Sequence, residues 1–132
     1  MQDYHQLKVW QRAMTYAVEL YKFTAQLPGD ERYNLTVQLR KAVVSVSLNI
    51  AEGASSATSA EFSHFLSYAY RSLKEVITGL ELCQRLYPSL SGEALSKLID
   101  EGNQISRMTH SLMLRLNAGD RGTTAGTDRS AW

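Results

Sequence analysis

One spacing in this chain has the form of a metal-binding motif. Glu61 and His64 are three residues apart, and di-iron bundles use such a Glu-x-x-His pair on each of two helices. A di-iron site also requires a second pair and a glutamate from each of two further helices, and the sequence contains no second Glu-x-x-His. We therefore expect no metal and no cofactor.

Nucleophilic chemistry is equally weakly supported. Cys83, the single cysteine, occupies an apolar position of a helical repeat, where a thiol packs as a small apolar group. His5, His64 and His110 lie far apart in the sequence, and no Arg-x-x-x-x-His pair of the kind found in some helical RNases occurs. No glycine-rich phosphate loop is present either. We expect a protein that is not an enzyme.

The basic residues suggest a different chemistry. The net charge is +1, so nucleic-acid binding would require locally clustered charge. Repeated around a ring, a modest patch becomes a strong field whose phosphate contacts depend on salt and hardly on base sequence. The predicted contact residues are Lys8, Arg12, Lys22, Lys41, Arg71 and Lys74. Aromatic residues that could stack on bases are Tyr4, Trp10, Tyr16, Tyr33 and Tyr68. The alternative is a solvated helix surface, with the aromatic residues in the core or at an interface.

One predicted helix, over about residues 34–52, is apolar nearly all round, and residues 42–51 carry no charge. Val43, Val46 and Ile50 follow the spacing of a core-facing stripe. Val44 and Leu48 lie off that stripe, and a helix that is apolar on all sides is normally buried on all sides. One small bundle core cannot cover both faces. We therefore predict that Val44 and Leu48 contact another copy of the protein.

Four polar residues lie on or beside the apolar helices, namely Arg40, Asn49, Glu52 and Glu75. Buried charges require partners. We predict an internal or inter-subunit network in which Arg40 meets Glu52 or Glu75. Ligand binding by the same residues is the alternative.

The elements that must position these residues are helices. Pro28 and Pro88 fall between long periodic segments. Helices are predicted over about residues 7–27, 34–52 and 92–117, with a third helix that follows Thr58 and extends to Tyr87. The predicted fold is all-α, an antiparallel up-down-up-down four-helix bundle over residues 1–117. Residues 118–132 are rich in glycine and threonine and are predicted to form a flexible tail.

Helix periodicity also predicts the core. The first helix is expected to bury Leu7, Trp10, Met14, Ala17, Tyr21 and Thr24. The third helix carries an a/d seam of Phe62, Leu66, Ala69, Leu73, Val76, Leu80, Cys83 and Tyr87. The inner face of the fourth helix is Leu95, Leu98, Gly102, Ile105, Leu112 and Leu116.

Three local signals mark helix ends and contacts. Thr58 and Glu61 form a predicted capping box at the start of the third helix. Gly53 is predicted to cap the end of the second helix in a left-handed conformation. Gly79, in the interior of the third helix, is predicted to mark a close approach of two helices.

The N-terminal segment MQDYHQLKVW has no apolar signal region, and no stretch reaches the roughly 18 apolar residues of a membrane span. Together with the lack of a disulfide framework, this favours a soluble cytoplasmic protein without a membrane partner.

Several short segments carry a family resemblance. They are Leu7-Lys8-Val9-Trp10-Gln11, Gln38-Leu39-Arg40-Lys41-Ala42, Ser45, Asn49-Ile50-Ala51-Glu52-Gly53, Glu61-Phe62 with Phe65-Leu66, Ala69, and Ser72-Leu73 with Glu75. Over about residues 4–115 the chain resembles the four helix bundle protein family, first known from proteins encoded in intervening sequences of bacterial large-subunit rRNA genes. A related group is formed by the accessory variability determinant proteins of diversity-generating retroelements.

The resemblance implies an antiparallel four-helix bundle that assembles into a ring-shaped homopentamer without enzymatic activity. By kinship with the retroelement proteins, it also implies binding of RNA and of a reverse transcriptase through a basic surface. The nearly neutral net charge departs from that basic pattern. We expect a non-enzymatic binding or scaffold protein with RNA as ligand, or alternatively a protein–protein adaptor without affinity for nucleic acid.

Overall fold

Four α-helices form a bundle in the computed structural model, which describes residues 3–121. They are α1 (Lys8–Thr24), α2 (Leu35–Ala54), α3 (Ser59–Leu86) and α4 (Glu93–Arg121). Short 3₁₀ helices, η1 (Tyr4–Gln6), η2 (Gly29–Glu31) and η3 (Pro88–Leu90), precede α1 and connect α1 to α2 and α3 to α4. No strand occurs within residues 3–121, which confirms the prediction of an all-α fold with four helices.

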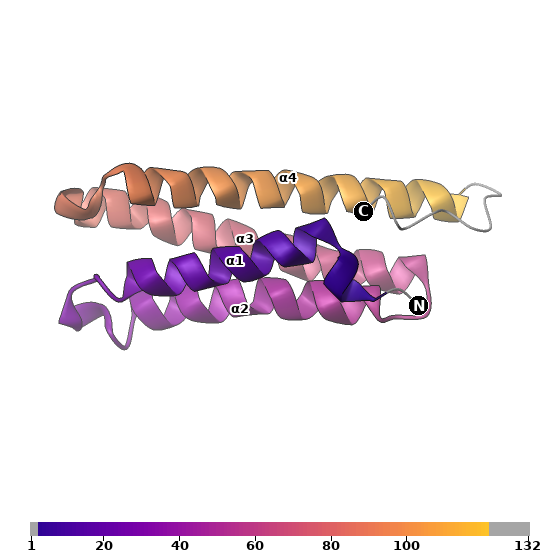
Figure 1. The fold of residues 1–132 in the computed structure, drawn as a ribbon, viewed down its shortest axis with the longest axis horizontal. Helices are drawn as coiled ribbons and strands as arrows, with labels where there is room; N and C mark the ends of the chain where they lie inside the picture. The colour runs from indigo at the N-terminus through magenta and orange to yellow at the C-terminus, as the bar shows by residue number, and fades with distance from the viewer. Residues whose placement is uncertain (1–2, 122–132) are drawn as a thin grey trace.

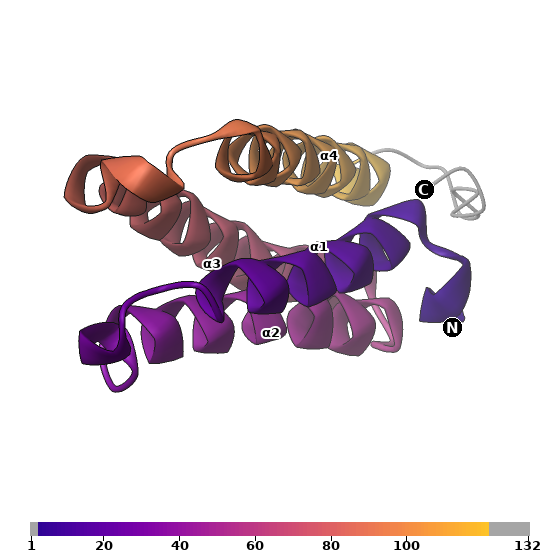
Figure 2. The same ribbon diagram turned by 60° about the vertical axis from the view of Figure 1, so that its left-hand side comes forward.

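The helices lie along one long axis (Figure 1). The α1–α2 and α3–α4 connections lie at one end of the bundle, and the α2–α3 connection lies at the other end (Figures 1 and 2). Adjacent pairs are α1–α2, α2–α3, α3–α4 and α4–α1, of which α2–α3 and α3–α4 pack most extensively. The α1–α4 pair packs least extensively of these four.

The a/d seam of α3 is confirmed by the burial of its side chains. From Phe62 to Cys83 every predicted seam residue is buried, and Tyr87 at the end is half-buried. The inner face predicted for α4 is buried as well. Thr58 begins α3 as predicted, since its Oγ1 accepts a hydrogen bond from the Glu61 backbone N–H at 3.1 Å.

The predicted buried face of the first helix is confirmed at Leu7 and Thr24, but between them it is displaced by about one residue. The residues of α1 that are buried are Val9, Ala13, Tyr16, Leu20, Phe23 and Thr24. Met14 and Tyr21, which were predicted to be buried, are exposed. Because α1 carries apolar residues on two adjacent faces, spacing alone does not show which face packs against the core.

Gly53 does not cap α2, which also corrects the prediction. The helix continues through Ala54, and Ser55 is its C-terminal cap. A Cβ at Gly53 would lie 2.9 Å from Phe62 Cδ1 and 2.9 Å from Phe65 Cβ, so glycine permits close contact between α2 and α3. The role predicted for Gly79 is confirmed, because a Cβ there would lie 2.5 Å from Leu39 Cδ2.

The end of α4 also differs from the prediction. Helix α4 continues through Arg121, whereas the predicted bundle ended at residue 117. The remainder of the predicted tail, residues 122–132, lies outside the described residues.

Candidate functional site

The six basic residues predicted to contact nucleic acid do not form one surface. Lys8, Arg12 and Lys22 are on α1, Lys41 is on α2, and Arg71 and Lys74 are on α3. Only Lys8 and Arg12 line the same groove. The structure therefore separates a candidate site at Lys8 and Arg12 from four basic residues elsewhere on the bundle.

The groove that contains Lys8 and Arg12 runs between α1 and α4 and has a volume of about 500 Å³. Helix α4 contributes two further cations, Arg107 and Arg115, and both side chains are exposed. No carboxylate is among the lining residues, which are Lys8, Val9, Arg12, Gln104, Arg107, Met108, Ser111, Leu112 and Arg115. This α1–α4 groove thus brings four basic residues, two from each helix, to one concave surface.

Arg107 and Arg115 were missed as site residues because they lie about a hundred positions from Lys8 in the sequence. Their spacing does carry a signal. Arg107, Ser111 and Arg115 follow at steps of four on α4, so they share one side of the helix. The sequence could predict that row, but only the packing of α4 against α1 places it opposite Lys8.

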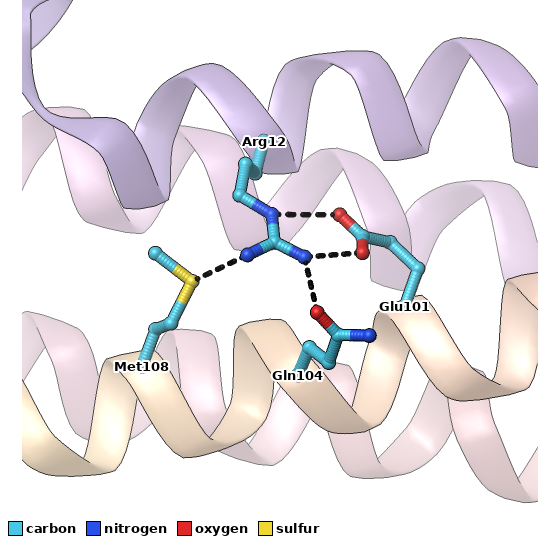
Figure 3. Close-up of polar contacts among 4 residues, drawn as sticks. All are labelled: Arg12, Glu101, Gln104 and Met108. Carbon is cyan, nitrogen blue, oxygen red and sulfur yellow. Dashed lines mark hydrogen bonds and ion pairs between the residues drawn. The ribbon is translucent and has the colours of Figure 1, made fainter.

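Arg12 is held in the groove by three residues of α4 (Figure 3). Its Nε donates to Glu101 Oε2 at 2.9 Å, and its Nη2 donates to Glu101 Oε1 and, at 2.8 Å, to Gln104 Oε1. Its Nη1 donates to Met108 Sδ at 3.2 Å. The hydrogen bond with Glu101 raises the pKa of Arg12 above its ordinary value, against the effect of burial. Arg12 therefore joins α1 to α4, with its charge offset by a bidentate carboxylate.

Three of the other four predicted basic residues, Lys22, Lys74 and Arg71, have local partners. Lys22 Nζ lies 3.3 Å from Oε1 of Glu19, a residue of the same helix. The Lys74 ammonium lies 5.0 Å from the centre of the Tyr70 ring, and the Arg71 guanidinium lies 6.0 Å from that of Tyr68. Both distances are within the range of cation–π contacts. Lys41 is exposed and lies beside Arg40.

Arg40 does not meet a carboxylate within the described chain, which corrects the internal network predicted for it. Its Nε donates to Thr24 Oγ1 at 2.9 Å and its Nη2 donates to the Tyr21 carbonyl at 3.2 Å. The guanidinium also lies 4.5 Å from the centre of the Tyr21 ring. Arg40 thus binds the C-terminal end of α1, where the helix dipole favours a cation. An inter-subunit contact of Arg40 stays a prediction.

Of the predicted network, Arg40, Asn49 and Glu52 line one hollow beside α2, whereas Glu75 lies on α3. Asn49 Nδ2 donates to the Ser45 carbonyl at 2.8 Å and to Ser45 Oγ at 2.9 Å. Ser72 Oγ donates to Ser45 Oγ at 2.9 Å, so this polar cluster joins α2 to α3. Glu52 and Glu75 are exposed, and no ion pair among the side chains of residues 3–119 includes either of them.

An apolar surface lies on the opposite side of α1 from the groove. Val44 is exposed and Leu48 is 60% exposed, although both are large apolar residues on a buried helix. They line a hollow of about 590 Å³ together with Met14, Val18 and Tyr21 of α1. We call these five residues the α1–α2 apolar face.

The aromatic residues considered for base stacking also have different environments. Tyr16 is buried in the core, which removes it as a stacking residue. Tyr4 stacks on His5 with ring centres 4.2 Å apart, and Trp10 packs edge-on against both. Tyr33 is 86% exposed. None of these aromatic residues lines the α1–α4 groove.

The residues considered for catalysis have structural surroundings. Cys83 is fully buried, and burial followed by the charge of Glu31 raises the pKa of its thiol to about 11. His64 Nε2 lies 2.8 Å from Tyr68 Oη. No group of three or more potential metal ligands occurs in the described part of the chain.

Sequence analysis did not single out Glu31, a buried carboxylate at the α1–α2 connection. It accepts hydrogen bonds from Tyr87 Oη and, at 3.2 Å, from Asn34 Nδ2. The hydrogen bond to Glu31 raises the pKa of Tyr87 to about 12. This contact joins the end of α3 to the loop before α2.

The fold and the groove define a small all-α bundle protein with one basic groove and one exposed apolar face. None of the described helices is both long and apolar enough to span a membrane. The model of the 23S rRNA-intervening sequence protein family matches residues 5–111, and the chain belongs to this family.

A similar solved structure is a protein of unknown function from the S23 ribosomal protein family of Bacteroides thetaiotaomicron, with a TM-score of 0.70. The two sequences are 21% identical over 80% of this chain and 97% of that chain, so the likeness concerns the fold. No curated protein sequence matches the chain.

Proposed function

We propose that this protein is a non-enzymatic, homo-oligomeric binding protein that presents basic residues to RNA. Each subunit is an antiparallel up-down-up-down bundle, and the subunits form a ring, with five copies implied by the family resemblance. The observation that carries the assembly is the α1–α2 apolar face. The basic α1–α4 groove supports RNA as the ligand.

The α1–α2 apolar face is unfavourable in water. Val18 is 55% exposed and Leu48 is 60% exposed. Burying a large aliphatic side chain stabilises a contact by roughly 1.5–3 kcal/mol, and contiguous exposed apolar residues often mark protein interfaces. Lys22, Lys41 and Glu52 lie around these residues and supply a polar rim. A second copy that covers the face would bury Val44 and Leu48, the apolar residues of α2 that do not face the bundle core.

The assembly is tested by Leu48→Glu, with native mass measured by light scattering after size exclusion. We expect the oligomer to dissociate, because a carboxylate cannot be buried there without a partner. Leu114→Glu is the matched control, since Leu114 is 56% exposed and lies on α4, away from the face. An unchanged mass for Leu48→Glu would exclude this face as the subunit contact.

RNA binding is tested with the nuclease-treated protein, titrated with RNA at two salt concentrations. We expect the affinity to fall steeply with salt, since each phosphate contact with a single strand contributes about −0.7 to the slope of log K against log salt. Failure to bind at low salt would refute the RNA function.

The second candidate function is a protein–protein adaptor, and exposed apolar residues favour it. Leu82 and Leu86 near the end of α3, and Tyr33 in the connection before α2, are exposed. The family resemblance suggests a reverse transcriptase as partner. An adaptor would form a stable complex with a co-expressed partner and would show no affinity for RNA.

A further inference from the structure

We infer that the α1–α4 groove is the phosphate-binding site, and that one half of it binds the backbone of an RNA strand through Lys8, Arg107 and Arg115. This inference rests on the proposed RNA function. It goes further because it assigns binding to one groove, and excludes Lys22, Lys41, Arg71 and Lys74 as main contacts.

Three cations of the groove have no carboxylate partner in the described structure, namely Lys8, Arg107 and Arg115. We call the part of the groove that they line the Lys8 half. Lys8, Arg107 and Arg115 are exposed, and no ion pair among the side chains of residues 3–119 includes them. Ser111 and Gln104 add neutral polar side chains to the lining. A phosphate entering this half would meet several donors and no lining carboxylate.

The cations form a row. Arg107 and Arg115 are eight steps apart on the helix, which correspond to about 12 Å along its axis. Lys8 and Arg12 are one turn apart on the facing helix α1. A row of this length suits a linear polyanion better than a single phosphate ion, because several charges can be neutralised together.

Glu101 sets the boundary of the basic half. It takes two of the hydrogen bonds that Arg12 donates, while Gln104 and Met108 take others (Figure 3). Beyond it, a second hollow contains Glu19 and Glu93 as well as Glu101, with Lys22 and Lys97 beside them. Lys97 Nζ lies 3.1 Å from Glu93 Oε1, so both lysines there have acidic partners. That side therefore offers a phosphate strand no lysine without an acidic partner.

The lining also indicates how the strand is recognised. The buried residues of the groove, Val9 and Leu112, are aliphatic, and no aromatic residue lines it. Bases therefore have no stacking surface within the groove, and contacts to phosphates carry no base sequence directly. The site is expected to bind RNA with little sequence preference.

The first experiment compares two double variants of equal charge change. Arg107→Gln with Arg115→Gln removes two groove cations, and Arg71→Gln with Lys74→Gln removes two on α3. Oligouridylate binding is measured at two salt concentrations, after circular dichroism and native mass have shown that both variants fold and assemble. We expect the groove variant to bind about tenfold or more weakly, with a salt slope shallower by about 1.4, that is two contacts of 0.7 each. The α3 variant should bind within about twofold of the wild type.

A second variant tests the boundary by a gain of affinity, which misfolding would not produce. Glu101→Gln removes the carboxylate that offsets Arg12, so the groove should bind oligouridylate several-fold more tightly. Glu75→Gln is its control, since Glu75 is an exposed glutamate on α3 outside the groove. Equal gains in both variants would mean that net charge alone sets the affinity, and would overturn the assignment of the site.

The outcomes separate this inference from the proposed function. If RNA binds normally but the groove variant keeps its affinity, the groove assignment fails and the RNA function stands. If the wild type binds no oligouridylate at low salt, both fail. Tripolyphosphate, a linear polyanion without bases, is the second probe. Binding of tripolyphosphate without oligouridylate would identify a site for free polyphosphates and overturn the RNA assignment. A tenfold preference for one RNA sequence would overturn recognition through the backbone.

Discussion

The contact between α2 and α3 (the α2–α3 seam) and the contact between α1 and α4 (the α1–α4 seam) have no helix in common, and they are built differently. At the α2–α3 seam, glycines bring the helices close together, as at Gly53, where a Cβ would lie 2.9 Å from Phe62 Cδ1. At the α1–α4 seam, Arg12 and Glu101 join the helices through side chains that are 37% and 32% exposed, beside an open groove.

This difference indicates a division of tasks. Close apolar packing without bound water contributes most to the stability of a bundle. A seam closed by long polar side chains contributes less, but it leaves donors accessible to a ligand. Stability is therefore expected to depend on the α2–α3 seam, and anion binding on the α1–α4 seam.

Among the variants that test this comparison, Phe62→Ala is expected to lower the free energy of unfolding most. Phe62 is fully buried. Removal of a buried phenylalanine ring costs about 3–5 kcal/mol, through lost burial and the cavity left behind. Urea denaturation followed by circular dichroism should show this loss. A loss below about 1 kcal/mol would mean that the α2–α3 seam is less closely packed than the structure indicates.

A smaller effect is expected from Gly53→Val. The added side chain would meet Phe62 and Phe65, and the backbone oxygen of Phe62 would lie 3.2 Å from its Cβ. Overpacking of this kind costs about 1–3 kcal/mol, which exceeds the gain in helix propensity. The free energy of unfolding should fall by about 2 kcal/mol.

Two controls define the cause of the Gly53→Val effect. Gly92→Ala should leave the free energy of unfolding nearly unchanged, because its Cβ would meet nothing within 4 Å. Gly53→Val should also cost less in a Phe62→Ala background, where the cavity accepts the new side chain. Additive losses in the double variant would show that the two residues do not contact each other.

The smallest effect is expected from Arg12→Met at the α1–α4 seam. Methionine keeps an apolar stem of similar length, and a partly exposed ion pair contributes about 1 kcal/mol or less. The urea midpoint should therefore shift only slightly. A loss as large as that of Phe62→Ala would show that the ion pair holds α1 against α4, and the proposed division between the seams would be wrong.

Periodicity predicted the parts of the fold that have one apolar face. The α3 seam and the inner face of α4 each show a single stripe bounded by polar residues, and both stripes are buried. Helix α1 has apolar residues on two adjacent faces, so its prediction placed Met14 and Tyr21 in the core. The ambiguity has a physical cause, because both faces of α1 are apolar, but only one packs in the bundle core and the other belongs to the exposed α1–α2 apolar face.

The candidate site was predictable only in part. Lys8 and Arg12 were selected from their charge, and they line the groove. Arg107 and Arg115 come from the far end of the chain, and no local pattern shows that α4 lies opposite α1. Arg40 was expected to meet a carboxylate and instead binds Thr24 and the Tyr21 carbonyl, because packing places the end of α1, with its oxygen acceptors, beside it.

The sequence by itself determined four helices, the buried stripes of α3 and α4 and the start of α3 at Thr58, because these follow from interactions within a few residues along the chain. The tertiary structure alone decided which face of α1 is buried, why residue 53 is glycine, and which cations share a groove. These features depend on residues far apart in the sequence, whose contacts are fixed only when the helices pack.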